Sequence, residues 1–169
     1  MPYQKFTTPL KDEVHPLVFN ANDTPTIGVE LEMQIVDAKT YALKSGILDL
    51  IKHVGKNQEW LKPELMQSYV EINTDVCQNI DEARRDLTAK LDKLYAAAVA
   101  NDMRLVWAGS HPFSAWMDQE ITPSPRYRKL VELMQDTARR IVTFGMHVHV
   151  GVDSGDKAVM VVDRLMRYL

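Results

Sequence analysis

The sequence has little cysteine, no long apolar run and no large excess of one charge. Its 169 residues include one cysteine, Cys77, so no internal disulfide can form, and no histidine motif nearby marks Cys77 as a nucleophile. We interpret Cys77 as a small strand or turn residue. No stretch approaches the length of a transmembrane helix, and no apolar segment of a signal peptide follows Met1. We therefore expect no membrane association and a cytoplasmic location.

The charge balance does not favour nucleic acid as a partner. Twenty Lys and Arg residues stand against 23 Asp and Glu residues, for a formal net charge of -3, and neither sign forms a long run. This balance gives no electrostatic reason to expect nucleic acid as a partner. The length and the 46% hydrophobic content suit one domain with a sizeable core. Residues 1–24, with three prolines and a polar end, are expected to form an irregular arm before a domain over residues 25–169.

Two stretches far apart in the chain alternate strictly between apolar and polar residues, as a β-strand with one buried face does. Residues 26–36 and residues 142–152 both show this pattern. We expect the apolar sets to face a core: Val29, Leu31, Met33 and Ile35 in the first strand, and Met146, Val148, Val150 and Val152 in the second. The opposite face would carry Glu30, Glu32 and Gln34 from the first strand and His147 and His149 from the second.

The remaining patterns predict two further strands, near residues 65–74 and 103–110, and four helices. The helices are expected between Ser45 and Gly55, from a cap at Asn79 or Asp81 to about Asn101, over residues 127–141, and after Ser154. The second helix carries four basic residues that we expect to be solvated, namely Arg84, Arg85, Lys90 and Lys93. The alternation of strands with helices suggests a parallel sheet. Because the strands carry polar groups on one face, an α+β fold with helices on one side and a polar cleft on the other fits better.

The polar face has the chemistry of a hard-cation site. Glu30 and Glu32 lie on the same side of one strand, roughly 6–7 Å apart, and carboxylates that close repel each other unless a cation neutralises them. Glu71 is the natural third carboxylate, and His147 or His149 would complete a set that suits Mg²⁺ or Mn²⁺. Such ions bridge the oxygens of phosphorylated substrates.

Two other interpretations of these residues stay open. Glu30 and Glu32 could simply line the solvated face of an antiparallel sheet, and a His-x-His pair could bind Zn²⁺ in a metal-dependent hydrolase. Three carboxylates and the lack of a nearby cysteine favour the hard cation. Among the arginines, only Arg126 is favoured for ligand binding, with its neighbour Tyr127, because they follow a proline-rich loop where a cleft could open.

The ordered set of motifs resembles a known family. It comprises Gly28-Val29-Glu30-Leu31-Glu32, then Glu64 and Glu71, Ser110-His111-Pro112-Phe113, Arg126-Tyr127, and Phe144-Gly145-Met146-His147-Val148-His149-Val150-Gly151. In this order the motifs resemble the YbdK-like carboxylate–amine ligases, the glutamate–cysteine ligase type 2 family. The resemblance implies a glutamine synthetase-like fold with a mostly antiparallel, curved sheet. Family members continue well beyond residue 169, so residues 25–169 would be the N-terminal portion of a catalytic domain with an incomplete sheet.

The resemblance also implies a reaction and roles for single residues. A glutamate-like carboxylate would be activated by ATP with Mg²⁺, or Mn²⁺ in its place, and an amine such as cysteine would then form the amide. Matched by position, Glu30, Glu32, Glu71 and His147 would be metal ligands. Glu64, Arg126 and Tyr127 would lie on the substrate side, and His149 would contact the nucleotide. An inactive or regulatory binding module of the same fold is the alternative, and the sequence is also compatible with a homo-oligomer.

Overall fold

A computed structural model describes residues 18–168, so most of the expected N-terminal arm lies outside the described residues. Residues 18–25 contain no helix or strand. The strands are β1 (Thr26–Asp37), β2 (Leu61–Pro63), β3 (Tyr69–Asn73), β4 (Met103–Val106) and β5 (Met146–Gly151). The helices are α1 (Ile47–Val54), α2 (Ile80–Ala100), α3 (Pro125–Met134), α4 (Asp136–Arg139) and α5 (Gly155–Leu165), with a short 3-10 helix at Trp116–Asp118.

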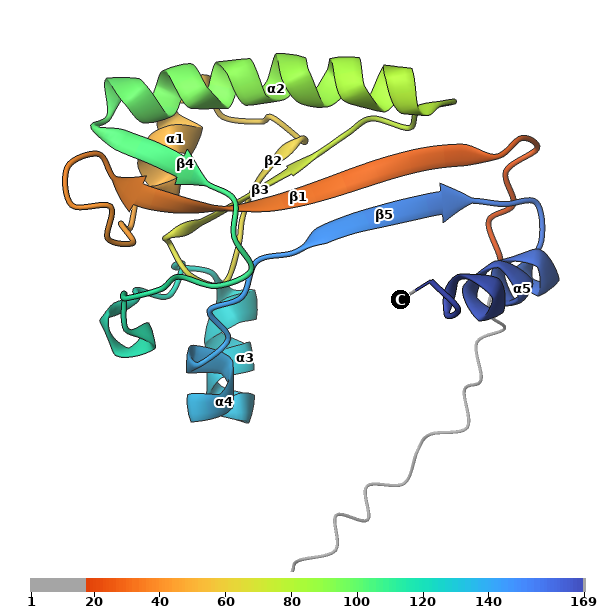
Figure 1. The fold of residues 1–169 in the computed structure, drawn as a ribbon. Coiled ribbons are helices and arrows are strands. Elements are labelled where there is room, and N and C mark those ends of the chain that lie inside the picture. Colours follow the sequence, from red (N-terminus) through yellow and green to blue (C-terminus); the bar gives the residue numbers. More distant parts are fainter. Residues whose placement is uncertain (1–17, 169) are drawn as a thin grey trace, which may run out of the picture.

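One antiparallel sheet organises the chain, and its longest strand, β1, lies at the centre (Figure 1). The strand order is β2-β3-β1-β4, and β5 also pairs with β1. β5 pairs with the first half of β1, from Thr26 to Leu31, whereas β4 pairs with its end, from Gln34 to Asp37. Over residues 18–168 the sheet does not close. The α+β class and the antiparallel sheet expected from the polar-faced strands are confirmed.

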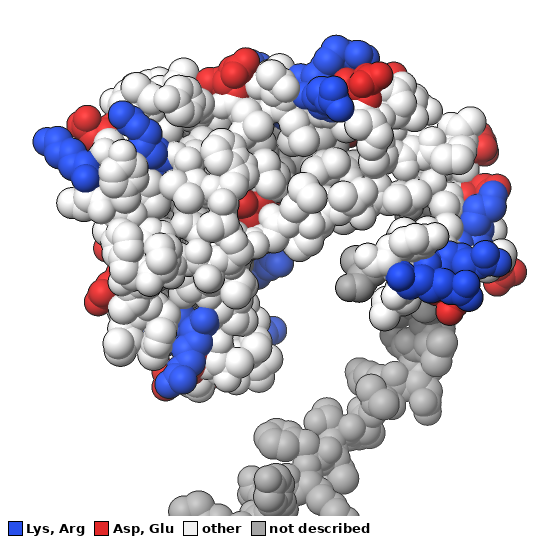
Figure 2. Space-filling view, in the orientation of Figure 1, with Lys and Arg blue, Asp and Glu red and all other residues white. Residues whose placement is uncertain are grey.

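The main core lies between β1 and the helices α1 and α2, which cover one face of the sheet (Figure 1). Met33 and Ile35 of β1 are fully buried there against Leu50 of α1 and Leu94 of α2. A second cluster, which includes Tyr69, Tyr127 and Phe144, packs α3 and α4 on the other side. Helices therefore occupy both sides of the sheet (Figure 1), and the space-filling view in the same orientation shows a hollow between α3/α4 and α5 (Figure 2). Among residues 18–168, no helix combines the length and apolar character that crossing a bilayer requires.

Local capping explains where the helices begin. Asn79, not Asp81, caps α2, because its side chain accepts a hydrogen bond from the Glu82 backbone N–H at 3.0 Å. The Glu82 carboxylate also accepts a hydrogen bond at 2.8 Å from the N–H of Gln78, the residue before the cap, and so holds the chain that leads into the helix. Ser154 caps α5 as expected. The expected cap at Ser45 is wrong: Gly46 precedes α1 and makes no side-chain cap.

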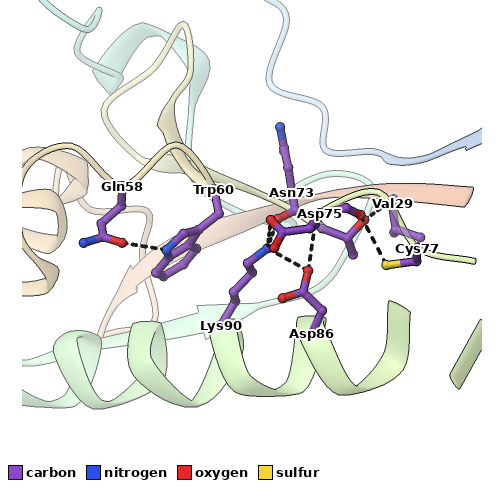
Figure 3. A network of polar contacts seen from close by, with 9 residues as sticks. Val29, Gln58, Trp60, Asn73, Asp75, Cys77, Asp86 and Lys90 are labelled. Atoms are coloured by element: carbon purple, nitrogen blue, oxygen red, sulfur yellow. Dashed lines mark hydrogen bonds and ion pairs between the residues drawn. The ribbon is translucent and has the colours of Figure 1, made fainter. Parts of the chain in front are cut away.

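Lys90 contradicts the prediction of a solvated basic face on α2. Its side chain is 8% exposed and donates to the Asn73 carbonyl oxygen at 3.0 Å, to Asp75 at 3.0 Å and to Asp86 at 2.7 Å (Figure 3). Asp86 also accepts from the Asp75 backbone N–H at 2.7 Å. A lysine can point inward from a helix when its ammonium finds this many oxygen partners. The network fastens α2 to the end of β3.

The alternation in β5 is correct, but the face assigned to its apolar residues is wrong. Met146, Val148 and Val150 are 68%, 54% and 48% exposed, and only Val152, just beyond the strand, is buried. They lie at the margin of the sheet, where β5 has β1 as its single partner among the described strands. Gln34 shows the reverse difference, because the alternation predicts it on the polar face and the structure buries it. It is fully buried and donates to the Ala108 carbonyl oxygen at 3.1 Å, instead of lining an open polar face.

Two other segments differ from the expected elements. Residues 65–74 contain the shorter strand β3, and a separate strand, β2, precedes it. The expected helix over residues 127–141 is divided into α3 and α4, because Gln135 has a positive φ of 49°. Residues other than glycine rarely adopt a positive φ, and a residue with a positive φ ends a helix.

Candidate active site

Glu30 and the two histidines meet across the β1–β5 pair. Glu30 lies opposite His147 in the strand register. Its Oε2 atom is 3.3 Å from His147 Nδ1 and 3.2 Å from His149 Nε2. The antiparallel register thus brings together residues separated by more than a hundred positions in the sequence, as the shared polar face predicted.

The imidazoles tune the Glu30 carboxyl group. Partial burial by itself would raise the pKa of Glu30, but the hydrogen bonds to His149 and His147 outweigh it and hold this pKa below its ordinary value. Glu30 is therefore an anion at neutral pH. An ionised carboxylate next to imidazole nitrogen supplies donor atoms of the two kinds that Mn²⁺ accepts.

Glu32 lies next along the same face and is fixed by the chain that leads into β5. Its Oε2 atom accepts a hydrogen bond from the Gly145 backbone N–H at 2.6 Å. A Cβ atom at position 145 would lie 2.9 Å from His147 Nε2 and 3.4 Å from Glu32 Oε2. Glycine at this position therefore lets the backbone come close to both side chains.

Glu71 and Glu64 extend the acidic group to the neighbouring strands. Glu71 lies directly opposite Glu32 in β3, is 7% exposed, and has an ion-pair contact of 3.4 Å with Lys62. Burial raises the pKa of Glu64, and the negative charges of Glu71 and Glu32 raise it further. Three carboxylates thus converge from different strand positions with one lysine beside them.

A cavity of about 390 Å³ opens beside these carboxylates. Five of the residues singled out in the sequence line it: Glu32, Glu64, Arg126, Tyr127 and His147. The Tyr127 hydroxyl donates to the Pro63 carbonyl oxygen at 3.0 Å, and the Arg126 guanidinium lies over the Tyr127 ring at 5.5 Å from its centroid. The cavity is therefore lined by acidic side chains and by one guanidinium group, that of Arg126.

A second cavity, of about 350 Å³, lies along the start of β1. Glu30 and His149 line it, together with Asn73, Thr74 and Asp75 from the end of β3. The first cavity takes Glu32 and His147 from the same two strands. The paired glutamates of β1 thus contribute to two different cavities, one residue to each.

The donor atoms suit a divalent cation, although the described residues do not form a finished cage. Within residues 18–168, no three His, Cys, Asp or Glu side chains are arranged to hold one ion together. The donor chemistry nevertheless fits, because the register places Glu32 opposite Glu71 and Glu30 opposite His147, and carboxylate oxygens are the ligands that such cations prefer. The metal-ligand roles of Glu30, Glu32, Glu71 and His147 stay a prediction.

Three further residues belong to the site, and the sequence reasoning did not assign them to it. Lys62 pairs with Glu71, while Tyr69 and Phe144 line the first cavity with their rings 4.2 Å apart. Tyr69 could have been found, because it precedes Glu71 by two positions on the same strand and therefore shares its face. No periodic signal marks Lys62 or Phe144.

His111, in the loop that the motifs included, has a structural role here. Its Nδ1 atom accepts a hydrogen bond from the Ser114 backbone N–H at 3.0 Å, so its other nitrogen carries the proton. That nitrogen, Nε2, lies 3.0 Å from the Tyr41 carbonyl oxygen. His111 thus ties its loop to the segment after β1 and lines neither of the two cavities.

An antiparallel sheet with acidic and imidazole side chains beside two cavities defines an α+β protein with a polar cleft. Comparison with known families makes this class specific. The family model described as glutamate–cysteine ligase family 2 matches residues 26–169. The chain belongs to this family, as the motifs predicted.

Curated relatives agree with this assignment. The chain is 42% identical over 156 residues to a protein of Thermobifida fusca, and 38% identical over 153 residues to one of Gloeobacter violaceus. Both carry a provisional name as glutamate–cysteine ligase 2. The matches cover 89% of this chain but 39% and 41% of those proteins. The chain thus spans about two fifths of the length of these relatives.

Solved structures share the fold at much lower sequence identity. A bifunctional glutathione synthetase from Pasteurella multocida matches with a TM-score of 0.56 and 14% identity, over 86% of this chain and 18% of that one. A glutamate–cysteine ligase from Francisella tularensis, solved with AMP, also gives a TM-score of 0.56 and 14% identity, over 85% and 30% of the two chains. These similarities concern the fold.

Proposed function

We propose that the chain contributes the paired-glutamate site of an ATP-dependent carboxylate–amine ligase of the glutamate–cysteine ligase type. The observation that carries the proposal is the position of Glu30 and Glu32 on one strand between two cavities. A reaction that joins two substrates and consumes ATP needs neighbouring binding cavities, so that the reacting groups of the bound molecules lie close together. Family membership and the AMP bound to the Francisella tularensis ligase support a nucleotide as one ligand.

The proposed reaction has two steps. A carboxylate oxygen of a glutamate-like substrate attacks the γ-phosphorus of ATP, the bond to the β,γ-bridging oxygen breaks, and ADP leaves. The amine nitrogen of a second substrate, such as cysteine, then attacks the acyl carbon of the acyl phosphate. Inorganic phosphate leaves, the nitrogen loses a proton, and an amide remains. The first step brings two anions together and the second expels phosphate, so positioning and charge stabilisation supply most of the catalysis.

Divalent cations fit the acidic side of the site. Glu30, Glu32, Glu71 and His147 are the residues that would hold Mg²⁺, or Mn²⁺ in its place. When bound, such an ion neutralises phosphate charge and orients the phosphoryl group. The chain itself orients these side chains, through the Gly145 N–H on Glu32 and the strand register that places His147 opposite Glu30.

The first cavity suits the substrates that are joined. Its Arg126 can bind a substrate carboxylate, and its Glu64 can bind an ammonium group, while Tyr127 forms part of the wall. His149 lines the second cavity, where we place contacts to the nucleotide. The Tyr127 hydroxyl stays protonated, because burial and the charge of Glu64 raise its pKa.

Release of ADP tests the proposal. The purified chain, supplied with ATP, Mg²⁺, glutamate and a panel of amines, should bind ATP and release ADP only when a carboxylate substrate is present. Glu30→Gln should abolish the release. Glu132→Gln, on the exposed surface of α3, is the matched control and should leave it unchanged. The absence of ATP binding at every Mg²⁺ concentration would contradict the proposal.

A binding module without catalysis is the second candidate. The lack of a three-ligand group of His, Cys, Asp or Glu side chains among residues 18–168 favours it. In that case calorimetry would show ATP binding that needs Glu30, with no ADP release for any amine. Stoichiometric zinc that survives dialysis would instead indicate the hydrolase alternative.

A further inference from the structure

The segment that follows β3 forms a bulge against β1 at the wall of the second cavity. At one end of the segment Asn73 pairs with Glu30. At the other end Cys77 pairs with Ile27, so three residues, 74–76, stand opposite two residues of β1. All three residues of the bulge line the second cavity. A bulge of this kind redirects a side chain and is common beside functional sites.

Helix α2 holds the middle residue of the bulge, Asp75, at two points (Figure 3). The Asp75 Oδ1 atom accepts a hydrogen bond from the Lys90 ammonium at 3.0 Å, and the Asp75 backbone N–H donates to Asp86 at 2.7 Å. Lys90 also donates to Asp86 at 2.7 Å, and its side chain is 8% exposed. The buried ammonium thus fixes both the backbone and the carboxylate of Asp75, whose own side chain stays 86% exposed at the cavity wall.

The second cavity offers polar atoms but no strong cation. Among the described residues that line it there is no lysine and no arginine. Phosphate groups therefore find a positive charge here only if a cation at Glu30 supplies it. The wall away from Glu30 carries the side chains of Asn22, Thr26 and Asp75. This part of the cavity suits an uncharged portion of a ligand that forms hydrogen bonds.

The Asp75 carboxylate has an oxygen atom available for such a ligand. Lys90 occupies its Oδ1 atom, whereas its Oδ2 atom accepts no hydrogen bond within residues 18–168. An ionised carboxylate only accepts hydrogen bonds, so the ligand must present a donor. The Lys90 charge beside it disfavours a cationic donor. Hydroxyl groups of a sugar are neutral donors, and a carboxylate is a known partner of ribose hydroxyl groups in nucleotide sites.

We infer that Asp75 accepts hydrogen bonds from the ribose hydroxyl groups of the nucleotide and that Lys90 is a positioning residue that orients this carboxylate. The inference rests on the proposed function, which places the nucleotide in the second cavity and its phosphates near Glu30. Asp75 lies two positions beyond Asn73, the partner of Glu30, or roughly 6–7 Å further along the strand. The ribose follows the phosphates in a nucleotide and would reach this part of the wall. Recognition of the sugar then depends on α2, although no residue of α2 lines the cavity.

Calorimetric titration with ATP and with 2′,3′-dideoxy-ATP, both in the presence of Mg²⁺, tests the inference on the full 169-residue chain. The wild type should bind ATP about tenfold more tightly, the factor expected when a hydrogen bond to a charged group is lost. Asp75→Ala should reduce this ratio of affinities to about one. Asp92→Ala, on the exposed face of α2, is the matched control and should keep the ratio of the wild type.

The ratio of affinities separates positioning from a general structural effect. Lys90→Met, measured at a temperature at which circular dichroism shows it folded, should lower the ratio to below about threefold. A general loss of structure would weaken both nucleotides alike and leave the ratio unchanged. Glu30→Gln should behave in that way, because the phosphates that Glu30 serves are the same in both nucleotides.

The possible failures can be told apart. If neither nucleotide binds, the proposed function is contradicted and the inference falls with it. Equal affinities in the wild type, or a ratio that Asp75→Ala leaves unchanged, overturn the inference while nucleotide binding itself stands. A ratio that Asp75→Ala removes and Lys90→Met preserves overturns the positioning role of Lys90.

Discussion

Lys90 offers the sharpest test of how α2 is fastened to the sheet. Replacing it by methionine keeps the apolar stem and removes the ammonium that contacts the Asn73 carbonyl oxygen, Asp75 and Asp86. Removing one partner of a buried ion pair costs about 3–5 kcal/mol. Asp75 and Asp86 are 86% and 24% exposed, so water can partly solvate them after the change. We therefore expect the lower end, a loss of about 3 kcal/mol in the free energy of unfolding.

Urea unfolding followed by circular dichroism measures this loss. A chain of this size should melt about 6–12 °C earlier for about 3 kcal/mol. Lys93→Met is the matched control, because Lys93 lies on the exposed face of the same helix, and it should change stability by less than about 0.5 kcal/mol. Equal stabilities of Lys90→Met and Lys93→Met would refute the account of the network in Figure 3.

The pH dependence of the Lys90 contribution has a defined sign. Burial would lower the pKa of Lys90, but hydrogen bonds and charges of Asp86 and Asp75 outweigh burial and hold this pKa above its ordinary value. A raised folded-state pKa gives stability that is complete below the unfolded value of about 10.4 and is lost as the pH rises through the folded value. The difference between wild type and Lys90→Met should therefore stay constant at neutral pH and decline only in strong alkali.

Three other changes test the core and the site. Leu94→Ala, which empties a fully buried position between α2 and the sheet, should cost about 2–5 kcal/mol in urea unfolding; a loss below about 1 kcal/mol would contradict the packing. Gly145→Ala should weaken Mn²⁺ binding with little loss of stability, because its Cβ would displace the His147 imidazole, and titration of both proteins with Mn²⁺ measures this; unchanged binding would count against the site. Because the pKa of Glu30 is lowered, its contribution to stability is present above its unfolded pKa and is lost as the pH falls through its folded value. Glu30→Gln should thus reduce the acid dependence of unfolding, and identical pH profiles of variant and wild type would contradict this.

The strand periodicity predicted much of the fold, because period-two alternation depends on one residue and its nearest neighbours. It placed β1 and assigned Glu30, Glu32 and the β5 histidines to one face, and the strand register then brought them together. Side-chain capping is equally local, which explains the correct start of α2 at Asn79.

Features that depend on distant partners could not be predicted in this way. Lys90 has the spacing of a surface residue, and only the oxygens at the end of β3 make burial favourable for it. The apolar face of β5 reads as core in the sequence, yet whether a face is buried depends on what lies beyond the strand. Lys62 joins the site through its pairing with Glu71 across two strands, a contact without a sequence pattern.

In the proposed function, the carboxylates around Glu30 and Glu32 form a divalent-cation site. Titration of the purified chain with Mn²⁺, followed by electron paramagnetic resonance of the free ion, measures this directly. We predict saturable binding that Glu30→Gln and Glu32→Gln each weaken at least tenfold and that Glu132→Gln leaves unchanged. Binding that is equally strong in all four proteins, or no saturable binding in the wild type, would contradict the claim.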